Sequence, residues 1–76
     1  MGGEFEKVRK IMSDHFGNDI ERIKPDSEII NDLKLDDLDM IELTMVLEET
    51  YKMIIPDDDV ERWRTVGDVA RYIAEN

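Results

Sequence analysis

Apolar residues recur at helical spacing in separate segments of this chain, and no segment shows sustained alternation of apolar and polar residues. An i, i+3, i+4, i+7 pattern is typical of an amphipathic helix, whereas period-two alternation is typical of a strand. The clearest stripes are Phe5, Val8, Met12 and Phe16 near the start, and Val66, Val69, Ala70 and Ile73 near the end. A chain of 76 residues without cysteine has no disulfide and must rely on packing such stripes together. The pattern therefore predicts an all-α fold in one domain covering residues 1–76.

Turn-forming residues divide this pattern into four expected helices, three long and one short, which together make a small four-helix bundle. We expect the helices over residues 4–16, from 36 or 37 to 51, from 57 to about 63, and from about 66 to 75. Gly17 is expected to end the first helix and Pro56 to open the third. The connection 19–35 should be fixed to the core by its apolar residues Ile20, Ile23, Ile29, Ile30 and Leu33. Residues 1–3 are interpreted as a cloning remnant or a frayed end.

The charge of the chain is concentrated in one third of its length. The formal net charge is −10, and residues 36–61 contain ten acids and one base, Lys52. Such a balance argues against binding to nucleic acid or to anionic membranes, both of which require basic surface. It fits a protein partner with a basic patch, although a solvated acidic face remains the alternative interpretation.

The second expected helix has apolar residues around most of its circumference. It is therefore either buried on most sides or leaves apolar side chains exposed. Asp36 is a natural N-cap for this helix. The acids Asp39, Glu42 and Glu49 fall within about 80° of arc at 100° per residue. One side is thus acidic and edged with hydrophobic residues, which suits docking to a groove on another protein.

The segment Asp36-Asp37-Leu38-Asp39 and three further motifs resemble the stand-alone bacterial acyl carrier proteins. The motifs are Val-Leu-Glu-Glu-Thr-Tyr, Ile-Pro-Asp-Asp-Asp and Thr-Val-Gly-Asp-Val, beginning at Val46, Ile55 and Thr65. They stand in the family's order, and the similarity extends from about residue 29 to 73 and more loosely over the first helix. This resemblance implies the family's fold, with three long helices and one short helix.

The resemblance implies that Asp37 stands where the family has the serine that holds a 4′-phosphopantetheine arm, with Asp36 and Leu38 beside it. The arm's thiol holds acyl groups as thioesters in fatty-acid or related lipid or polyketide biosynthesis. A carboxylate has no hydroxyl to attack coenzyme A, so no arm is attachable at Asp37. The aspartate is an engineered replacement, a natural loss of the serine, or a sign that the parent family uses another residue. Aspartate keeps the net charge of −10 that a serine parent would have after gaining the phosphodiester.

The resemblance also implies a recognition surface for enzymes with basic patches, among them acyl-transfer and chain-elongation enzymes and a phosphopantetheinyl transferase. Its expected residues are Leu38, Asp39, Glu42, Met45, Glu48, Glu49, Ile55 and Asp57. Candidates to line an acyl pocket, or to form ordinary core, are Ile41, Met45, Val46, Ile55, Val60 and Ala70. One departure is Lys34-Leu35, where many members have a glycine and a small residue; it predicts a stiffer and more apolar loop.

Three other interpretations follow from the residues. Catalysis is disfavoured because His15 has no nucleophile beside it in the pattern, and no catalytic residue is predicted. Four acids have the spacing of EF-hand positions 1, 3, 5 and 12, but Arg62 stands where the loop needs glycine, so no metal site is predicted. A non-carrier interaction module with the same fold remains the main alternative.

With no signal-peptide pattern or membrane-length apolar run, we expect a cytoplasmic monomer.

Overall fold

The computed structural model describes residues 3–76, which contain four α-helices and one 3-10 helix joined by loops. They are α1 (Gly3–Phe16), η1 (Ile20–Arg22), α2 (Asp37–Tyr51), α3 (Asp57–Val60) and α4 (Val66–Glu75). The predicted all-α fold with three long helices and one short helix is confirmed, and within residues 3–76 no strand forms. Gly3 is the first residue of α1, and Met1 and Gly2 lie outside the described residues. No helix in residues 3–76 has the length and apolar character to cross a bilayer.

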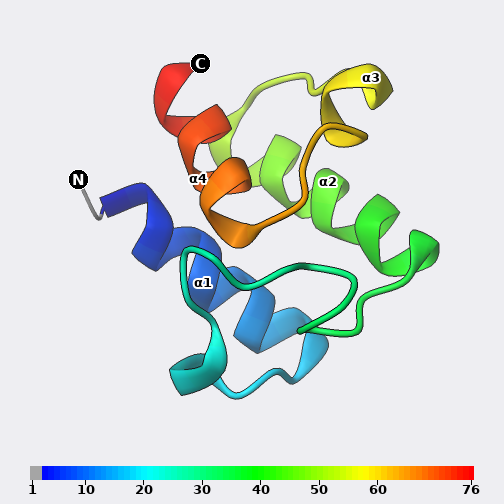
Figure 1. Ribbon diagram of the computed structural model, residues 1–76. Helices are drawn as coiled ribbons and strands as arrows, with labels where there is room; N and C mark the ends of the chain where they lie inside the picture. Colours follow the sequence, from blue (N-terminus) through cyan, green and yellow to red (C-terminus); the bar gives the residue numbers. More distant parts are fainter. Residues whose placement is uncertain (1–2) are drawn as a thin grey trace.

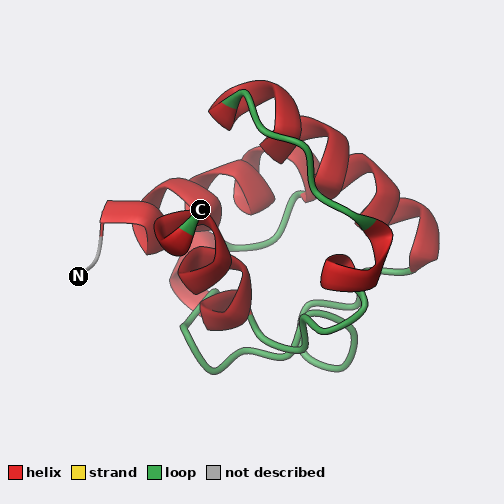
Figure 2. Ribbon diagram, turned by 90° about the horizontal axis from the view of Figure 1, so that it is seen from above, coloured by secondary structure: helices red, strands yellow, loops and turns green. Residues whose placement is uncertain are grey.

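The two stripes that predicted the fold meet in the core between α1 and α4. Val8 and Met12 of α1 are fully buried, and all four stripe residues of α4 are buried. The two helices lie beside each other, with α2 and α3 on the other side of the molecule (Figures 1 and 2). Each residue of these stripes removes apolar surface from water, which is the dominant favourable term in folding.

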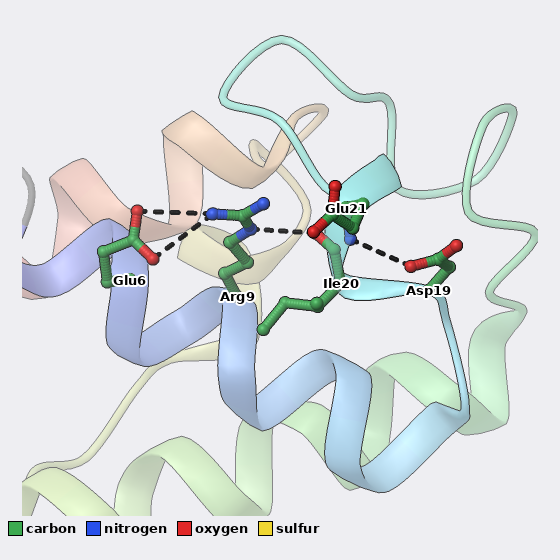
Figure 3. A network of polar contacts seen from close by, with 5 residues as sticks. All are labelled: Glu6, Arg9, Asp19, Ile20 and Glu21. Atoms are coloured by element: carbon green, nitrogen blue, oxygen red, sulfur yellow. Dashed lines mark hydrogen bonds and ion pairs between the residues drawn. The ribbon is translucent and has the colours of Figure 1, made fainter.

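The connection between α1 and α2 is attached to α1 by polar contacts. Arg9 donates from Nε to the Ile20 carbonyl at 2.9 Å, and its Nη1 lies 3.3 Å from Glu6 Oε1 (Figure 3). Asp19 caps η1 by accepting the Glu21 N–H at 3.0 Å. The expectation for the apolar residues of this connection is confirmed for Ile23, Ile29 and Leu33, which are buried, and wrong for Ile20 and Ile30, which are exposed. At Ile20 the backbone carbonyl, not the side chain, makes the attachment to α1.

The same connection is hydrogen-bonded to the start of α4. The Ile29 N–H donates to the Arg64 carbonyl at 2.9 Å, and the Val66 N–H donates to the Ser27 carbonyl at 3.0 Å. Gly67 donates to the Pro25 carbonyl at 2.8 Å, and a Cβ at Gly67 would lie 2.8 Å from that oxygen. Only glycine permits this close approach without a shift of the backbone.

Helix α3 is shorter than predicted, ending at Val60 instead of Trp63. The N–H groups of Arg62 and Trp63 donate to the carbonyls three residues earlier, at 3.1 Å each, so the chain tightens into turns. Trp63 is nevertheless buried, and its ring packs edge-on against Tyr72 with centroids 5.4 Å apart. The Tyr72 hydroxyl donates to Asp59 Oδ2 at 2.7 Å, which attaches α3 to α4.

Candidate functional site

The first turn of α2 is closed by a pair of reciprocal hydrogen bonds. Asp36 Oδ1 accepts the Asp39 N–H at 2.9 Å, and Asp39 Oδ2 accepts the Asp36 N–H at 3.1 Å. This capping box satisfies two backbone donors that would otherwise lack partners. The predicted N-cap is thus confirmed. Asp37, the first residue of the helix, is exposed beside this box.

The loop that leads into α2 contains a left-handed residue followed by a buried one. Lys34 has a φ of 62°, in the left-handed region that favours glycine. Leu35 is 3% exposed, and its N–H donates to the Ile29 carbonyl at 3.2 Å. The position immediately before the cap is therefore held against the core.

Helix α2 has two apolar faces on opposite sides. Leu43 and Leu47 are completely buried and face the core. Leu38, Ile41 and Met45 are 75%, 58% and 63% exposed. The centres of the two sets lie about 180° apart at 100° per residue. We call Leu38, Ile41 and Met45 the exposed ridge. The sequence left open whether this helix is buried on most sides or exposes apolar side chains. The structure shows that the helix is buried on one side and presents apolar groups to solvent on the other.

A groove of about 410 Å³ lies between α2 and α3, next to the exposed ridge. Its lining includes Asp37 and the pocket candidates Ile41, Met45, Ile55 and Val60. The other two candidates lie elsewhere. Val46 borders a shallow surface on α2 with Glu42 and Glu49, and Ala70 packs in a hollow between α1 and α4 with Phe5 and Pro25. The structure therefore brings four of the six predicted pocket residues together.

Two hydrogen bonds hold the walls of this groove in place. Glu48 Oε2 accepts the Ile55 N–H at 2.8 Å, which fixes the loop after α2 against the helix. On the other wall, the bond from Tyr72 to Asp59 holds α3, and this bond together with burial raises the pKa of the Tyr72 hydroxyl. The groove is thus shaped by contacts within the chain.

Acidic side chains flank the exposed ridge. Glu42 has a 56% exposed side chain and lies 3.9 Å from His15 Nδ1, at the surface. Glu49 and Asp57 are exposed. Two other acids predicted for partner binding also have roles inside the protein: Asp39 belongs to the capping box and Glu48 holds the loop. The predicted acids therefore differ in how freely their charge can contact a partner.

Several residues of this region were missed by the sequence interpretation. Ile54 is 87% exposed, the highest value among the large hydrophobic residues. The sequence feature that could have identified Ile54 is the apolar run Met53-Ile54-Ile55, which lies outside any expected helix. Met40, Thr44 and Glu61 also line the groove. The helical spacing of 37, 40, 41, 44, 45 and 48 could have identified the first two as neighbours of Asp37 on one face.

Two of the four acids with EF-hand spacing are used for other contacts. Asp59 accepts the Tyr72 hydroxyl, and Asp68 accepts the N–H groups of Arg64 and Thr65 at 3.0 and 3.1 Å. In the described part of the chain, no group of three or more His, Cys, Asp or Glu side chains is arranged to hold a metal ion.

Comparison with known proteins identifies the class to which this fold and surface belong. The family model described as the phosphopantetheine attachment site matches residues 6–73. An acyl carrier protein of Clostridium perfringens is 44% identical over 72 residues, which cover 95% of each chain. Acyl carrier proteins of Clostridium acetobutylicum and Helicobacter hepaticus are 46% and 42% identical, over 91% and 95% of this chain and 90% and 95% of their own. This chain belongs to the acyl carrier protein family. Its relatives are carriers rather than catalysts; the family's prosthetic group is 4′-phosphopantetheine, and its members interact with biosynthetic enzymes.

Proposed function

We propose that this chain is an acyl carrier protein whose attachment position is occupied by Asp37, so that it docks to carrier-binding enzymes without an arm. The observation that supports this most directly is the place of Asp37, exposed at the start of α2 between a complete capping box and the exposed ridge. In a parent with serine here, the arm would hold acyl intermediates as thioesters for fatty-acid or related lipid or polyketide biosynthesis.

The groups at the start of α2 do not fit a phosphodiester-linked arm. The Asp37 carboxylate lacks a hydroxyl that could become the bridging oxygen of a phosphodiester. Among the lining residues of the groove, Thr44 is the one with a hydroxyl, and it donates to the Met40 carbonyl at 2.8 Å, about two turns into the helix. We therefore assign no step of the family's chemistry to an arm on this chain.

The charge at this position supports the interpretation of a carrier whose docking surface is preserved. Aspartate places one negative charge where the phosphodiester of an arm would place one. The N-terminus of a helix favours an anion, because its backbone N–H groups and its dipole point toward it. The surface therefore resembles that of an armed carrier in charge, although it has no thiol.

We assign docking to a face made of the exposed ridge with Glu42, Glu49 and Asp57, which we call the docking face. Leu38, Ile41 and Met45 supply apolar area, and the acids supply an electrostatic rim for an enzyme with a basic patch. Rim charges speed and orient encounter, whereas buried apolar contacts contribute most of the affinity. Asp39 and Glu48 serve mainly to hold this face in shape. In a serine variant, the groove beside Ile41, Met45, Ile55 and Val60 would be the place for an acyl chain.

Mass spectrometry tests this proposal. The chain is incubated with coenzyme A and a phosphopantetheinyl transferase, in parallel with the variant Asp37→Ser. The variant should gain the mass of one arm and the original chain should gain none. A gain on the original chain, or no gain on a folded Asp37→Ser variant, would contradict the proposal.

A non-carrier interaction module with the same fold is the second candidate, and the exposed ridge favours it because such a surface can bind a partner without any arm. Codon 37 of the gene distinguishes the two. A serine codon means that the aspartate was engineered into a carrier. An aspartate codon supports a protein that docks and is never loaded.

A further inference from the structure

A second apolar space lies between α1, the connection that follows it, and α4, and we call it the α1–α4 hollow. Its volume is about 470 Å³, compared with about 410 Å³ for the groove beside α2. Its lining consists of five apolar residues, glycine included, and two charged ones: Phe5, Pro25, Gly67, Ala70 and Ala74, with Glu4 and Arg71. Because α1 and α4 lie together, with α2 and α3 on the other side of the molecule (Figures 1 and 2), the hollow is separate from the docking face.

We propose that the α1–α4 hollow binds an aliphatic carboxylate of medium length non-covalently, with the alkyl chain along α4 and the carboxylate at Arg71. The inference goes beyond the proposed function, because neither Asp37 nor the docking face takes part in it.

The shape of the hollow suits an alkyl chain. Gly67, Ala70 and Ala74 lie on one face of α4, over about 10 Å of its axis. None of these residues has a side chain that extends beyond Cβ, so a linear group can lie close to the helix backbone. The volume of the hollow falls within the range of about 300–1,000 Å³ that is usual for small-molecule sites. A small molecule is therefore a better occupant than a protein surface.

The walls of the hollow are held in place by contacts within the chain. The Arg9 guanidinium lies 5.8 Å from the centroid of the Phe5 ring, and Arg9 is itself held by the Ile20 carbonyl (Figure 3). At the start of α4, the Gly67 N–H donates to the Pro25 carbonyl at 2.8 Å. Little ordering is then needed when a ligand binds, and preorganisation of this kind favours affinity.

The charged residues of the hollow favour a carboxylate as the head group. The Arg71 side chain is 68% exposed, and its Nη1 lies 3.5 Å from Asp68 Oδ1, at the limit of a hydrogen bond. A guanidinium has five N–H donors and can hold a carboxylate with two of them side by side, so donors remain for a ligand. Glu4 borders the hollow from α1. Burial and the charge of Glu4 raise the pKa of the Tyr51 hydroxyl, which places this carboxylate near the end of α2.

Charge also disfavours the groove beside α2 as a site for the same ligand. The charged residues among those that line the groove are all acids: Asp37, Glu48, Asp57 and Glu61. A free carboxylate in the groove would be repelled by these four side chains, whereas in the hollow it meets a guanidinium. The α1–α4 hollow is therefore the apolar space that accepts an alkyl chain with a free negative head.

Calorimetric titration of the chain with octanoate, at neutral pH and low salt, tests the inference. We expect one site with a Kd on the order of 1 mM or tighter. Hexanoate, which is two methylenes shorter, should bind about tenfold more weakly. Octanol and octylamine keep the chain length and change the head; octanoate should bind most tightly of the three and octylamine most weakly. In amide NMR spectra, octanoate should shift the signals of Gly67, Ala70 and Ala74 and leave those of Ile41 and Val60 in place.

Two variants identify the parts of the site. Arg71→Gln should weaken octanoate about fivefold, the upper end for an exposed ion pair, and leave octanol unchanged. Arg62→Gln is the matched control, because it removes the same charge from an exposed residue outside the hollow. Ala74→Leu fills part of the hollow from an exposed position, and it should weaken octanoate and octanol about tenfold, since it displaces about two buried methylenes. Circular dichroism melting checks that the variants remain folded.

Three results would overturn the inference. The first is the absence of both binding heat and amide shifts with octanoate on the folded chain. The second is equal affinity for the three head groups, or tightest binding of octylamine, which would exclude Arg71 as the group that selects the ligand. The third is a set of shifts confined to Ile41 and Val60, or binding that Ala74→Leu does not weaken, which would place the ligand outside the hollow. None of these results alters the mass-gain experiment on Asp37→Ser, so this inference and the proposed function can fail separately.

Discussion

Lys34 occupies a backbone conformation that its side chain disfavours. Its φ of 62° places Cβ close to the following carbonyl, a clash that glycine avoids. The next residue, Leu35, is buried, and Asp36 then caps α2. The chain must turn sharply here to bury one residue and cap a helix with the following one. The strain at Lys34 is thus a consequence of the restraints that hold the docking face.

Replacing this lysine with glycine should stabilise the protein. Relief of the left-handed strain is worth about 1–2 kcal/mol, and the greater freedom of glycine in the unfolded chain offsets about 0.4–1 kcal/mol of it. We expect Lys34→Gly to raise the free energy of unfolding by about 0.5 kcal/mol, measured by urea denaturation. Lys34→Ala keeps Cβ and should show no such gain. A glycine variant less stable than the alanine variant would contradict this account.

At the scale of elements, α2 and α4 differ in how much their sequences reveal. The stripe of α4 is confined to one face, and its bounds and buried side were predicted correctly; in the structure Thr65 and Asp68 form the capping box at its start. Helix α2 was bounded correctly by the same kind of signal at Asp36. Its buried face was not predicted, because apolar residues surround it. Only packing against the other helices determines that Leu43 and Leu47 lie inside.

The N-terminus of α4 should make stability depend on pH. The N–H of Arg64 donates to the Asp68 carboxylate, and this bond, with those from Thr65, lowers the pKa of Asp68 below its ordinary value of 3.8 despite partial burial. When the pKa of a carboxyl is lower in the folded than in the unfolded protein, the carboxyl stabilises the fold. This contribution is complete at pH values above the unfolded pKa. That contribution is lost as the pH falls through the lower, folded pKa.

Asp68→Asn keeps an oxygen acceptor but removes the charge, so it should cost about 0.3–1 kcal/mol at neutral pH, the usual value of a carboxylate at a helix N-terminus. The difference from the original chain should shrink as the pH falls below 3.8. Urea denaturation at a series of pH values measures both. Asp58→Asn removes the same charge from an exposed position and provides the comparison. A cost for Asp68→Asn that stays constant down to the lowest pH would exclude the charged carboxylate as its source.

At the scale of the whole molecule, the helical fold and the bounds of its three long helices could be predicted because they depend on local signals. The groove could not be predicted in full, because α3 is held by long-range contacts such as Tyr72 to Asp59, which no local pattern encodes. For this reason Val46 and Ala70 were placed in one pocket with Ile41, although the packing of the helices separates them. Asp37 could be located at the start of α2 from its neighbours alone.

The concentration of charge on one part of the molecule has a cost for folding. Residues 36–61 have a net charge of −9 within a protein that measures 28 × 27 × 20 Å. Like charges at such distances repel, and they destabilise the compact state more than the extended chain. Glu49 is exposed in the last turns of α2, where the negative end of the helix dipole also disfavours an acid. The acids of the docking face are therefore kept at the expense of stability.

Neutralising one of these acids should stabilise the fold in a salt-dependent way. We expect Glu49→Gln to raise the free energy of unfolding by about 0.5 kcal/mol at low ionic strength. The gain should largely vanish in 1 M salt, where the Debye length falls to about 3 Å. Glu6→Gln is the matched control, because Glu6 lies 3.3 Å from Arg9 in the nearly balanced part of the chain and its loss should bring no gain. Thermal melts of the three proteins across a salt series measure the effect. If Glu49→Gln stabilised the protein equally at all salt concentrations, repulsion within the docking face would not be the cause of the gain.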